Sequence, residues 1–346
     1  MEKLFSHKPT GTVLTFGEVM LRLCPDDAGD WLNTENSLPV YIAGAELNVA
    51  SALALWGVPA KYFTALPDNK LAKQVVDYIE KQNIDTSSIY YHGSRMGVLY
   101  LTPGLDLKHD ALIYDRAHSA FAELKTGMVD WDKVLDGVSW FHFSAICPAV
   151  SASAARVCKE VLEAASRKKI TISVDLNYRA KLWKYGKTPL QVMPGLIKYC
   201  DVVMGNIWAA EQMLGMGVDP ELHVKNSKKE YLTASIVTSA KIMMQYPKCK
   251  VVANTFRFDA SEDIRYYTTL WGGNPMHHSA EHKTPYIINK VGSGDCFMAG
   301  LIYGFYNGLE PQETLEFATA AAFNKLFVKS DIIDKTVEEI KNTIQQ

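Results

Sequence analysis

The 346-residue chain lacks the features that mark several large classes of protein. Its 36 basic and 38 acidic side chains give a formal net charge of -2, so no overall positive field attracts it to nucleic acid or acidic membranes. The start, MEKLFSHKPTGTV, has no apolar run typical of a signal peptide, and no stretch is long and apolar enough to span a bilayer. We therefore expect a soluble cytoplasmic protein.

Cysteine and histidine do not occur in metal-binding spacings. His277, His278 and His282 are not spaced like a ligand pair on a helix or strand, and no acid-rich partner is evident, so we predict no metal site there. The cysteines contain no C-x-x-C pair and are predicted to be buried thiols of a reducing compartment. They are Cys24, Cys147, Cys158, Cys200, Cys249 and Cys296.

Three common catalytic and nucleotide-binding motifs are also missing. No G-x-G-x-x-G follows the first predicted strand, which argues against a dinucleotide-binding fold of the Rossmann type. Neither the phosphate-binding motif G-x-x-x-x-G-K-[ST] nor the nucleophile motif G-x-S-x-G is present. Any phosphate or nucleophile chemistry must therefore use other residues.

What the chain does have is a regular alternation of strand and helix patterns. Apolar, β-branched runs such as GTVLTF, AKYFTAL, WFHFSAI, ITISVDLN, DVVMGN and KVVANT alternate with helical stretches such as AELNVASALALWG and KLAKQVVDYIEKQN. This order is typical of βαβ units and a mostly parallel sheet. With 48% hydrophobic residues, the chain can bury the core of one large α/β domain or two smaller ones.

Two stretches interrupt this alternation. Residues 21–43 carry turn signals between short extended pieces, and residues 90–116 resemble hairpin strands around PGLD. The two could pair into one small sheet beside the main domain, or they could be ordinary surface loops.

The stretch VGSGDCFMAG is the most suggestive local feature. Gly292, Ser293 and Gly294 lead into a predicted helix that begins near Asp295, and consecutive amides at a helix N-terminus bind anions. Asp295 cannot help to bind an anion. Its carboxylate is either a base for a substrate hydroxyl or a plain helix cap, and the spacing does not decide between them.

A second cluster follows the buried strand ITISVDLN. Asp175, Asn177 and Arg179 alternate, and a period of two places them on one face. Together they could bind a polar substrate or organise the waters of a metal ion, or they could form a salt-bridged loop. In open α/β sheets, ligands bind at the carboxyl ends of strands, where these residues are expected.

Two further clusters carry small or charged residues. Gly44 precedes a helix with Asn48, which allows a ligand to approach the backbone, although a tight strand-to-helix turn explains the glycine as well. Tyr114 and Arg116 end the second β segment. Arginine suits a carboxylate through bidentate geometry, whereas an exposed arginine is usually only solvated.

Taken together, these motifs resemble those of the ribokinase-like (PfkB) carbohydrate kinases. GAELNVASALALWG, TALPDN, DLNYR and VGSGDCFMAG occur in the order of that family and cover nearly the whole chain. GEVMLRL, RMGVLYL, IYDRAHSA and DLNYRAKLW are most similar to 2-keto-3-deoxygluconate kinases. The resemblance implies one ribokinase-like domain over residues 1–346: a three-layer α/β/α fold with a mostly parallel central sheet and a β-sheet lid from about 21–43 and 90–116.

The resemblance also implies a reaction and its residues. ATP with Mg²⁺ would phosphorylate the terminal hydroxyl of a sugar acid, with Asp295 as base and the amides of Gly292, Ser293 and Gly294 stabilising the transferred group. A lid-mediated homodimer is a further implication. The residues implied to bind the sugar are Gly44, Asn48, Tyr100, Tyr114, Arg116, Asn177 and Arg179. Those implied to bind the nucleotide are Asn206, Thr255, Arg257 and Asn324.

The chain departs from the family pattern mainly on the nucleotide side. Ala43 replaces the first glycine of a Gly-Gly pair, and Ala209 stands where the N-x-x-E motif has its glutamate, with Glu211 out of register. The sequence ANTFRFDASED replaces a glycine-rich turn. Two alternatives therefore stay open: a kinase of a neutral sugar such as fructose, or a catalytically weakened binding protein of the same fold.

Overall fold

The computed structural model describes residues 10–25, 31, 38–101, 112–225, 227–259 and 263–344. It contains a large central sheet in which strands follow the order β15-β14-β13-β12-β11-β10-β1-β4-β6, with β16 also paired to β14. From β13 to β6 all neighbouring strands are parallel, while β14, β15 and β16 form an antiparallel edge. The strands are β1 (Thr12–Phe16), β4 (Ala60–Phe63), β6 (Ile84–Asp85), β10 (Val138–Ser144), β11 (Thr171–Asp175), β12 (Val202–Gly205), β13 (Val251–Asp259), β14 (Ile264–Trp271), β15 (His277–His278) and β16 (His282–Thr284).

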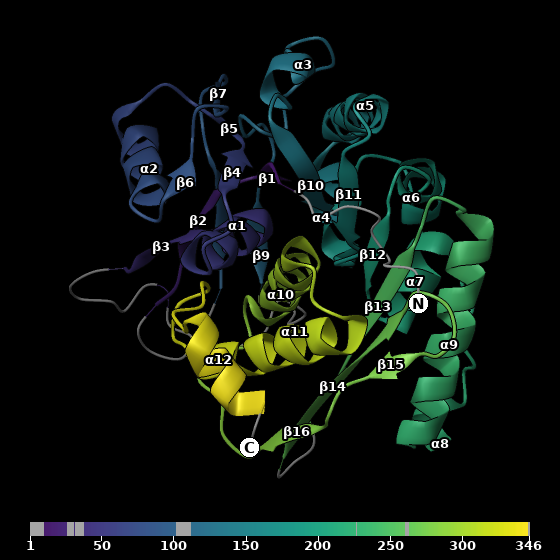
Figure 1. Ribbon diagram of the computed structural model, residues 1–346. Coiled ribbons are helices and arrows are strands. Elements are labelled where there is room, and N and C mark those ends of the chain that lie inside the picture. The colour runs from purple at the N-terminus through teal and green to yellow at the C-terminus, as the bar shows by residue number, and fades with distance from the viewer. Residues whose placement is uncertain are drawn as a thin grey trace.

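Helices cover both faces of this sheet, as Figure 1 shows. One face packs against α1, α2, α10 and α11, and the other against α5, α6, α7 and part of α9. The predicted three-layer α/β/α architecture is thus confirmed. The helices are α1 (Ala45–Leu55), α2 (Lys70–Glu80), α3 (Trp131–Val134), α4 (Ile146–Val150), α5 (Ala152–Arg167), α6 (Pro189–Ile197), α7 (Ile207–Leu214), α8 (Leu222–Lys225), α9 (Lys228–Gln245), α10 (Ser293–Asn307), α11 (Pro311–Lys325) and α12 (Val337–Ile344).

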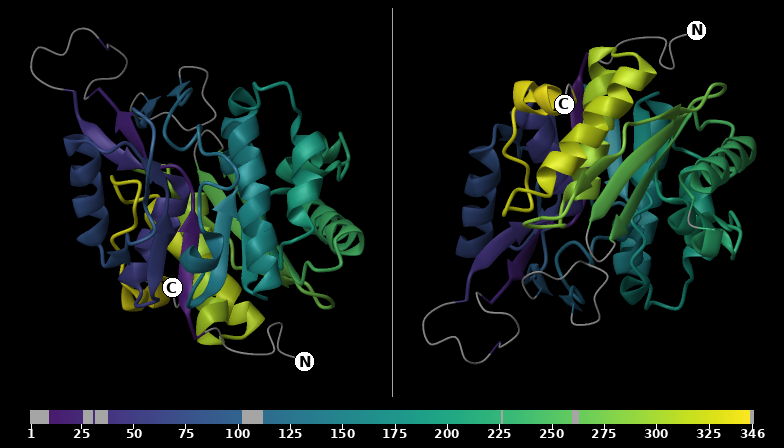
Figure 2. Two further views of the ribbon diagram at one scale, coloured as in Figure 1. Left: turned by 90° about the horizontal axis from the view of Figure 1, so that it is seen from above. Right: turned by 90° about the horizontal axis from the view of Figure 1, so that it is seen from below.

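The two β segments that interrupt the alternation form a separate four-stranded sheet. Its order is β3-β2-β8-β9, from β2 (Met20–Leu23), β3 (Val40–Ala43), β8 (Gly97–Tyr100) and β9 (Ile113–Asp115). This small sheet, called the lid sheet below, lies apart from the central sheet (Figure 2). The turn predicted around PGLD lies outside the described residues.

Several element boundaries differ from the prediction. The run AKYFTAL splits at Thr64 into β4 and β5 (Ala65–Leu66), and β5 pairs with β7 (Tyr90–Tyr91) outside the central sheet. The strand predicted through Ile146 ends at Ser144, where α4 takes over. The helix α6 begins at Pro189 and was not predicted from the sequence. Proline is tolerated there because the first helical turn needs no amide donor at that position.

The core accounts for the apolar composition. Two clusters, one on each face of the central sheet, bury side chains such as Trp140 and Phe143 completely. All six cysteines are buried and lie outside any disulfide, as predicted. None of the helices in the described ranges combines the length and apolar character that crossing a bilayer requires.

Candidate active site

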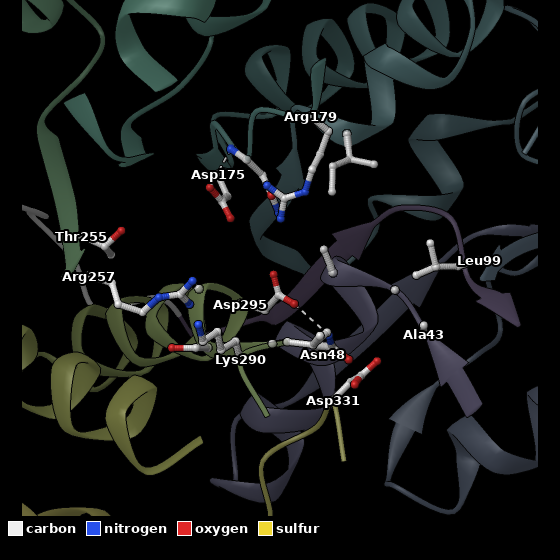
Figure 3. A pocket seen from close by; sticks show the side chains of 18 of the residues that line it. Ala43, Asn48, Leu99, Asp175, Arg179, Thr255, Arg257, Lys290, Asp295 and Asp331 are labelled. Carbon is white, nitrogen blue, oxygen red and sulfur yellow. Dashed lines mark hydrogen bonds between the residues drawn. The ribbon is translucent and has the colours of Figure 1, made fainter. Parts of the chain in front are cut away.

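A cavity of about 420 Å³ lies between the lid sheet and the carboxyl ends of β11 and β12 (Figure 3). This is the position at which open α/β sheets bind their ligands. Its lining comprises Met20, Ala43, Gly44, Ala45, Asn48, Leu99, Tyr114, Arg116, Ile146, Asp175, Asn177, Arg179, Asn206, Trp208, Thr255, Arg257, Asp259, Tyr266, Lys290, Val291, Gly292, Ser293, Gly294, Asp295 and Asp331.

Apart from Tyr100 and Asn324, every residue predicted for the site lines this cavity. Tyr100 ends β8, and its ring meets the ring of Trp31 edge-on at a centroid distance of 5.7 Å. The amide of Asn324 turns towards α12, donating to the carbonyl of Ala320 at 2.8 Å and to Thr343 Oγ1 at 3.0 Å. Both side chains therefore have partners away from the cavity, which the linear sequence does not reveal.

The geometry of α10 removes one interpretation of Asp295. The helix begins at Ser293, the N-cap residue is Gly292, and no side chain caps it. Asp295 therefore lies within the first turn, three residues after the N-cap Gly292. Its Oδ2 accepts a hydrogen bond of 2.7 Å from Asn48 Nδ2 of α1, drawn as a dashed line in Figure 3. The carboxylate is thus directed at the cavity and held there by a second helix.

The turn before α10 is shaped for an anion. Gly292 has a left-handed φ of 83°, and a Cβ at this position would collide with the carbonyl oxygen of Asp331. Only glycine fits both conditions. The first amides of a helix have no partner within it, so those at the start of α10 carry partial positive charge. Gly292, Ser293 and Gly294 all line the cavity, so the start of α10 meets the conditions for anion binding.

Burial perturbs the two carboxylates that face each other across this site. Burial raises the pKa of Asp295 to about 7; the Asn48 hydrogen bond opposes this shift, and the nearby Asp175 adds to it. The pKa of Asp175 also rises, to about 6, for the same reason, against the opposing effects of the Asn177 amide and Arg179. A carboxylate with a pKa near 7 can exchange a proton close to neutrality, which suits a general base.

Two arginines reach the cavity in different electrostatic states. Arg116 Nε lies 2.6 Å from Glu18 Oε2, and both side chains are buried. Its charge is therefore largely balanced inside the protein, although its Nη1 has no hydrogen-bond partner within the described residues. Arg179 donates to the carbonyl of Tyr178 at 3.1 Å, and its buried Nε is likewise without a partner there. Buried donors without partners indicate a polar or anionic ligand.

The other end of the cavity is built from the ends of β12 and β13. Asn206 caps α7, accepting a 2.8 Å hydrogen bond from the Ala209 amide, and Thr255 Oγ1 donates to the carbonyl of Gly205. Ala209 is buried and brings only a methyl group. Glu211 is turned away, where its carboxylate accepts from the amide of Val218 at 3.0 Å. Neither Ala209 nor Glu211 therefore brings a carboxylate to the cavity.

A pair of cations that share one carboxylate also lines this end. Arg257 Nε lies 3.3 Å from Asp259 Oδ1, and Lys290 Nζ lies 2.7 Å from Asp259 Oδ2. The sequence reading missed Lys290 and Asp259. A signal was present for Asp259, because Thr255, Arg257 and Asp259 alternate along β13 and so share a face. In Figure 3, Thr255, Arg257 and Lys290 lie to one side of Asp295, and Ala43 and Leu99 to the other.

With this geometry established, similarity to known proteins identifies the family. The chain matches the pfkB family carbohydrate kinases over residues 11–334. It belongs to this family. The chain is thus an ATP-dependent carbohydrate kinase, and the ribokinase-like resemblance of its motifs is confirmed.

Individual relatives are similar over almost the full chain. A 2-dehydro-3-deoxygalactonokinase of Haloferax volcanii is 26% identical and covers 97% of each chain. A 5-dehydro-2-deoxygluconokinase of Clostridium beijerinckii is 24% identical over 96% of this chain and 93% of its own. Among solved structures, a 2-dehydro-3-deoxygluconokinase of Thermotoga maritima is 33% identical, with a TM-score of 0.87 over 97% of this chain and all of the other.

Proposed function

We propose that this kinase transfers the γ-phosphoryl group of ATP to the terminal hydroxyl of 2-keto-3-deoxygluconate. The observation that carries the proposal is one cavity that brings together Asp295, the Gly292–Gly294 turn and Arg179. The three relatives are named as kinases of dehydro-deoxy sugar acids, which favours a substrate of that class. The names differ in the position of the keto group and in stereochemistry, so the substrate class is supported more firmly than the individual sugar.

The proposed reaction is a single displacement at phosphorus. The terminal hydroxyl oxygen forms a bond to the γ-phosphorus, its proton passes to the carboxylate of Asp295, and the bond from phosphorus to the bridging oxygen breaks. The electron pair of that bond leaves with ADP. The amides of Gly292, Ser293 and Gly294 stabilise the charge on the transferred group, the largest contribution expected for such a reaction.

The residues present also suit Mg²⁺ carried by the nucleotide. Magnesium prefers oxygen ligands and usually keeps several waters, so it needs few protein groups. The oxygen-bearing side chains of Asp175 and Asn206, which line the cavity, would hold its waters beside the phosphates. When bound, the ion neutralises charge on the β- and γ-phosphates. Because Ala209 supplies no carboxylate, the nucleotide itself would hold most of the ion.

Preference for an acid sugar would come mainly from Arg179. Its Nε is buried and unpaired within the described residues, whereas Arg116 is already matched by Glu18. A sugar carboxylate would accept a hydrogen bond from this unpartnered donor, and charge-assisted hydrogen bonds are about twice as strong as neutral ones. Arg116 would then contribute through its unpaired Nη1 and by shaping the wall beside Tyr114.

The lid sheet would close over the sugar and exclude water, which limits wasteful hydrolysis of ATP. It would also form a homodimer interface. Its two edge strands, β3 and β9, expose Val40 and Ile113, each more than half accessible. Exposed apolar residues on unpaired sheet edges favour association with another chain. Light scattering of the purified protein tests the dimer, and a monomer would contradict it.

The decisive test is a panel of possible acceptors. We would measure ADP release with 2-keto-3-deoxygluconate, its galacto epimer, 5-keto-2-deoxygluconate and fructose, and locate the new phosphate by ³¹P NMR. We expect the highest kcat/KM with 2-keto-3-deoxygluconate and phosphate on its terminal oxygen. Preference for fructose would overturn the acid-sugar assignment, and absence of turnover with every acceptor would favour the weakened binding protein.

A further inference from the structure

A lysine is completely buried behind the anion-binding turn. Lys325, the last residue of α11, has no exposed surface and is one of the largest fully buried side chains of the described chain. Lysine is almost never fully buried unless its charge is paired. Its Nζ donates to the carbonyl of Val328 at 3.3 Å, a neutral and rather long contact. The position of this ammonium group therefore requires an explanation.

Lys325 lies directly against the backbone of Gly292. A Cβ built on Gly292 would come within 3.3 Å of Lys325 Cε. The end of α11 is also tied to both sides of the turn, since Ser293 Oγ donates to the carbonyl of Ala322 at 3.0 Å and the Ile288 amide donates to the carbonyl of Leu326 at 2.8 Å. The ammonium group thus lies behind the amides that face the cavity.

No carboxylate among the described neighbours belongs to Lys325 alone. Asp331 attracts Lys325, but its carboxylate also lies 3.1 Å from Arg22 Nε of β2, so two cations share one carboxylate. Asp295 and Cys296 of α10 are the other titratable groups that face Lys325. Burial lowers the pKa of Lys325, and attraction to Asp331, Cys296 and Asp295 opposes that shift, while Arg22 adds to it.

A simpler explanation is that Lys325 completes the negative end of α11. Lysine is favourable in a last helical turn, by less than about 1 kcal/mol at exposed positions. Such lysines normally extend their ammonium group into water. Burying the ion costs several kcal/mol, which that interaction does not offset. The direction of the side chain, towards the turn and not towards solvent, indicates a role at the cavity.

We propose that Lys325 is a positioning residue of the anion site: its ammonium supports the Gly292–Gly294 turn and adds positive potential behind the transferred phosphoryl group. The inference rests on the proposed function, because it concerns the same turn. In a buried site a fixed charge acts through a low dielectric, so its influence on a phosphoryl group is larger than in water.

The test compares Lys325→Met with wild type. Methionine keeps the length of the side chain without its charge, and Arg22 and Asp331 remain as a matched pair. We expect kcat to fall about 10- to 100-fold, or about 1.4–2.7 kcal/mol at 1.36 kcal/mol per factor of ten. The KM for the sugar should stay within about twofold, since the sugar does not touch Lys325, and Tm should not fall. Lys335→Met, at a partly exposed lysine paired with Glu339, is the matched control and should match wild type.

A purely structural role gives the opposite pattern, with a lower Tm and unchanged kcat per folded molecule, and that result would overturn the proposal. If Lys325→Met does not fold, the proposal is tested by measuring the kcat of wild type as the pH is raised above neutrality. Activity should fall with an inflection below the usual lysine value of about 10.4, because neutral Lys325 no longer assists. A flat profile up to that pH would equally overturn it.

A third measurement separates this inference from the proposed function. If wild type phosphorylates no sugar acid, the function fails, and the anion site is then probed with tripolyphosphate by calorimetry. Wild type should bind tripolyphosphate about tenfold more tightly than Lys325→Met, which corresponds to about 1.4 kcal/mol. Equal affinities would refute the role of Lys325 whatever the sugar.

Discussion

The two ends of the cavity are built in different ways. The acceptor end, beneath the lid sheet, rests on buried and mutually paired groups, such as Asn48 with Asp295 and Arg116 with Glu18. The donor end presents Arg257 and Lys290, whose side chains are about a quarter exposed and which share Asp259. The acceptor end is therefore preorganised. At the donor end, the two cations are partly open to solvent, so phosphate groups can replace the Asp259 carboxylate as their partner.

This difference matches where the chain departs from its family. The motifs of the acceptor end are present apart from Ala43, while the donor end lacks the glutamate at Ala209 and differs in the sequence ANTFRFDASED. A buried network tolerates little change, because removing one partner leaves the other desolvated and unpaired. Solvent-exposed cations can be repositioned at small cost. The comparison predicts large effects of mutation at the acceptor end and small ones at the donor end.

The largest effect is expected at Asp295, where the two ends meet. Asp295→Asn keeps the shape of the side chain and removes the base, so kcat should fall about 10²- to 10⁴-fold. Steady-state kinetics with saturating ATP and sugar measure this. A variant that retained more than a tenth of wild-type activity would refute the proposed base.

The raised pKa of Asp295 gives this prediction a pH signature. In wild type, kcat/KM should decline as the pH falls below about 7, because the carboxylate becomes protonated. Stability should respond in the opposite sense. The folded pKa lies above the ordinary 3.8, so ionising Asp295 destabilises the folded state. Asp295→Asn should therefore have a higher Tm than wild type at pH 8, and the difference should vanish near pH 4.

The next largest effect is on stability, at Arg116. Arg116→Met leaves the Glu18 carboxylate buried and unpaired, which should lower the free energy of unfolding by about 3–5 kcal/mol. Urea denaturation measures the loss, and adding Glu18→Gln should recover most of it. Arg95→Met is the control in the same region, since the pair of Arg95 with Asp115 is partly exposed and worth about 1 kcal/mol or less. Equal losses for both arginines would contradict the buried network.

Arg179 should affect binding more than stability. Arg179→Met removes charged hydrogen bonds to the sugar acid, so KM for that substrate should rise about 10- to 100-fold, with little change for ATP. Arg179 also holds down the pKa of Asp295, so the acidic limb of the pH profile should move to higher pH. The exposed Lys184→Met is the control. An unchanged KM would show that Arg179 does not select the acid.

The smallest effects are expected at the donor end. Arg257→Met and Lys290→Met should each raise KM for ATP about three- to tenfold, because partly exposed charges contribute about 1 kcal/mol. The effect should weaken at high salt, while KM for the sugar stays constant. Lys283→Met, at an exposed lysine of β16, provides the baseline. A rise in KM for ATP as large as the rise in sugar KM expected for Arg179→Met would contradict the proposed difference between the two ends.

How far the sequence could predict this site depends on the range of the interactions. Asp175, Asn177 and Arg179 were found because they are close in sequence and follow a strand. Asp331 was missed, although it lines the same cavity, because it comes from the loop after α11 and no local pattern marks it. A nucleotide-binding role of Asn324 was implied by the resemblance and stays a prediction. The structure directs its amide to α12, a contact made only when the helices pack.

The sequence by itself determined the alternation of strands and helices and the chemistry available at the cavity, because periodicity and turn signals act over a few residues. It left open whether the two interrupting β segments pair, which the lid sheet decides. Only the tertiary structure decided which of the site's side chains are paired, which are buried and how their pKa values shift. It pairs Arg116 with a glutamate 98 residues away, raises the pKa of Asp295 by burial, and places Lys325 behind Gly292. Each of these depends on which surfaces exclude water together, and spacing along a chain does not encode that. The stretch VGSGD thus supplies the glycine amides and the carboxylate, and the packing around it determines their burial and charge.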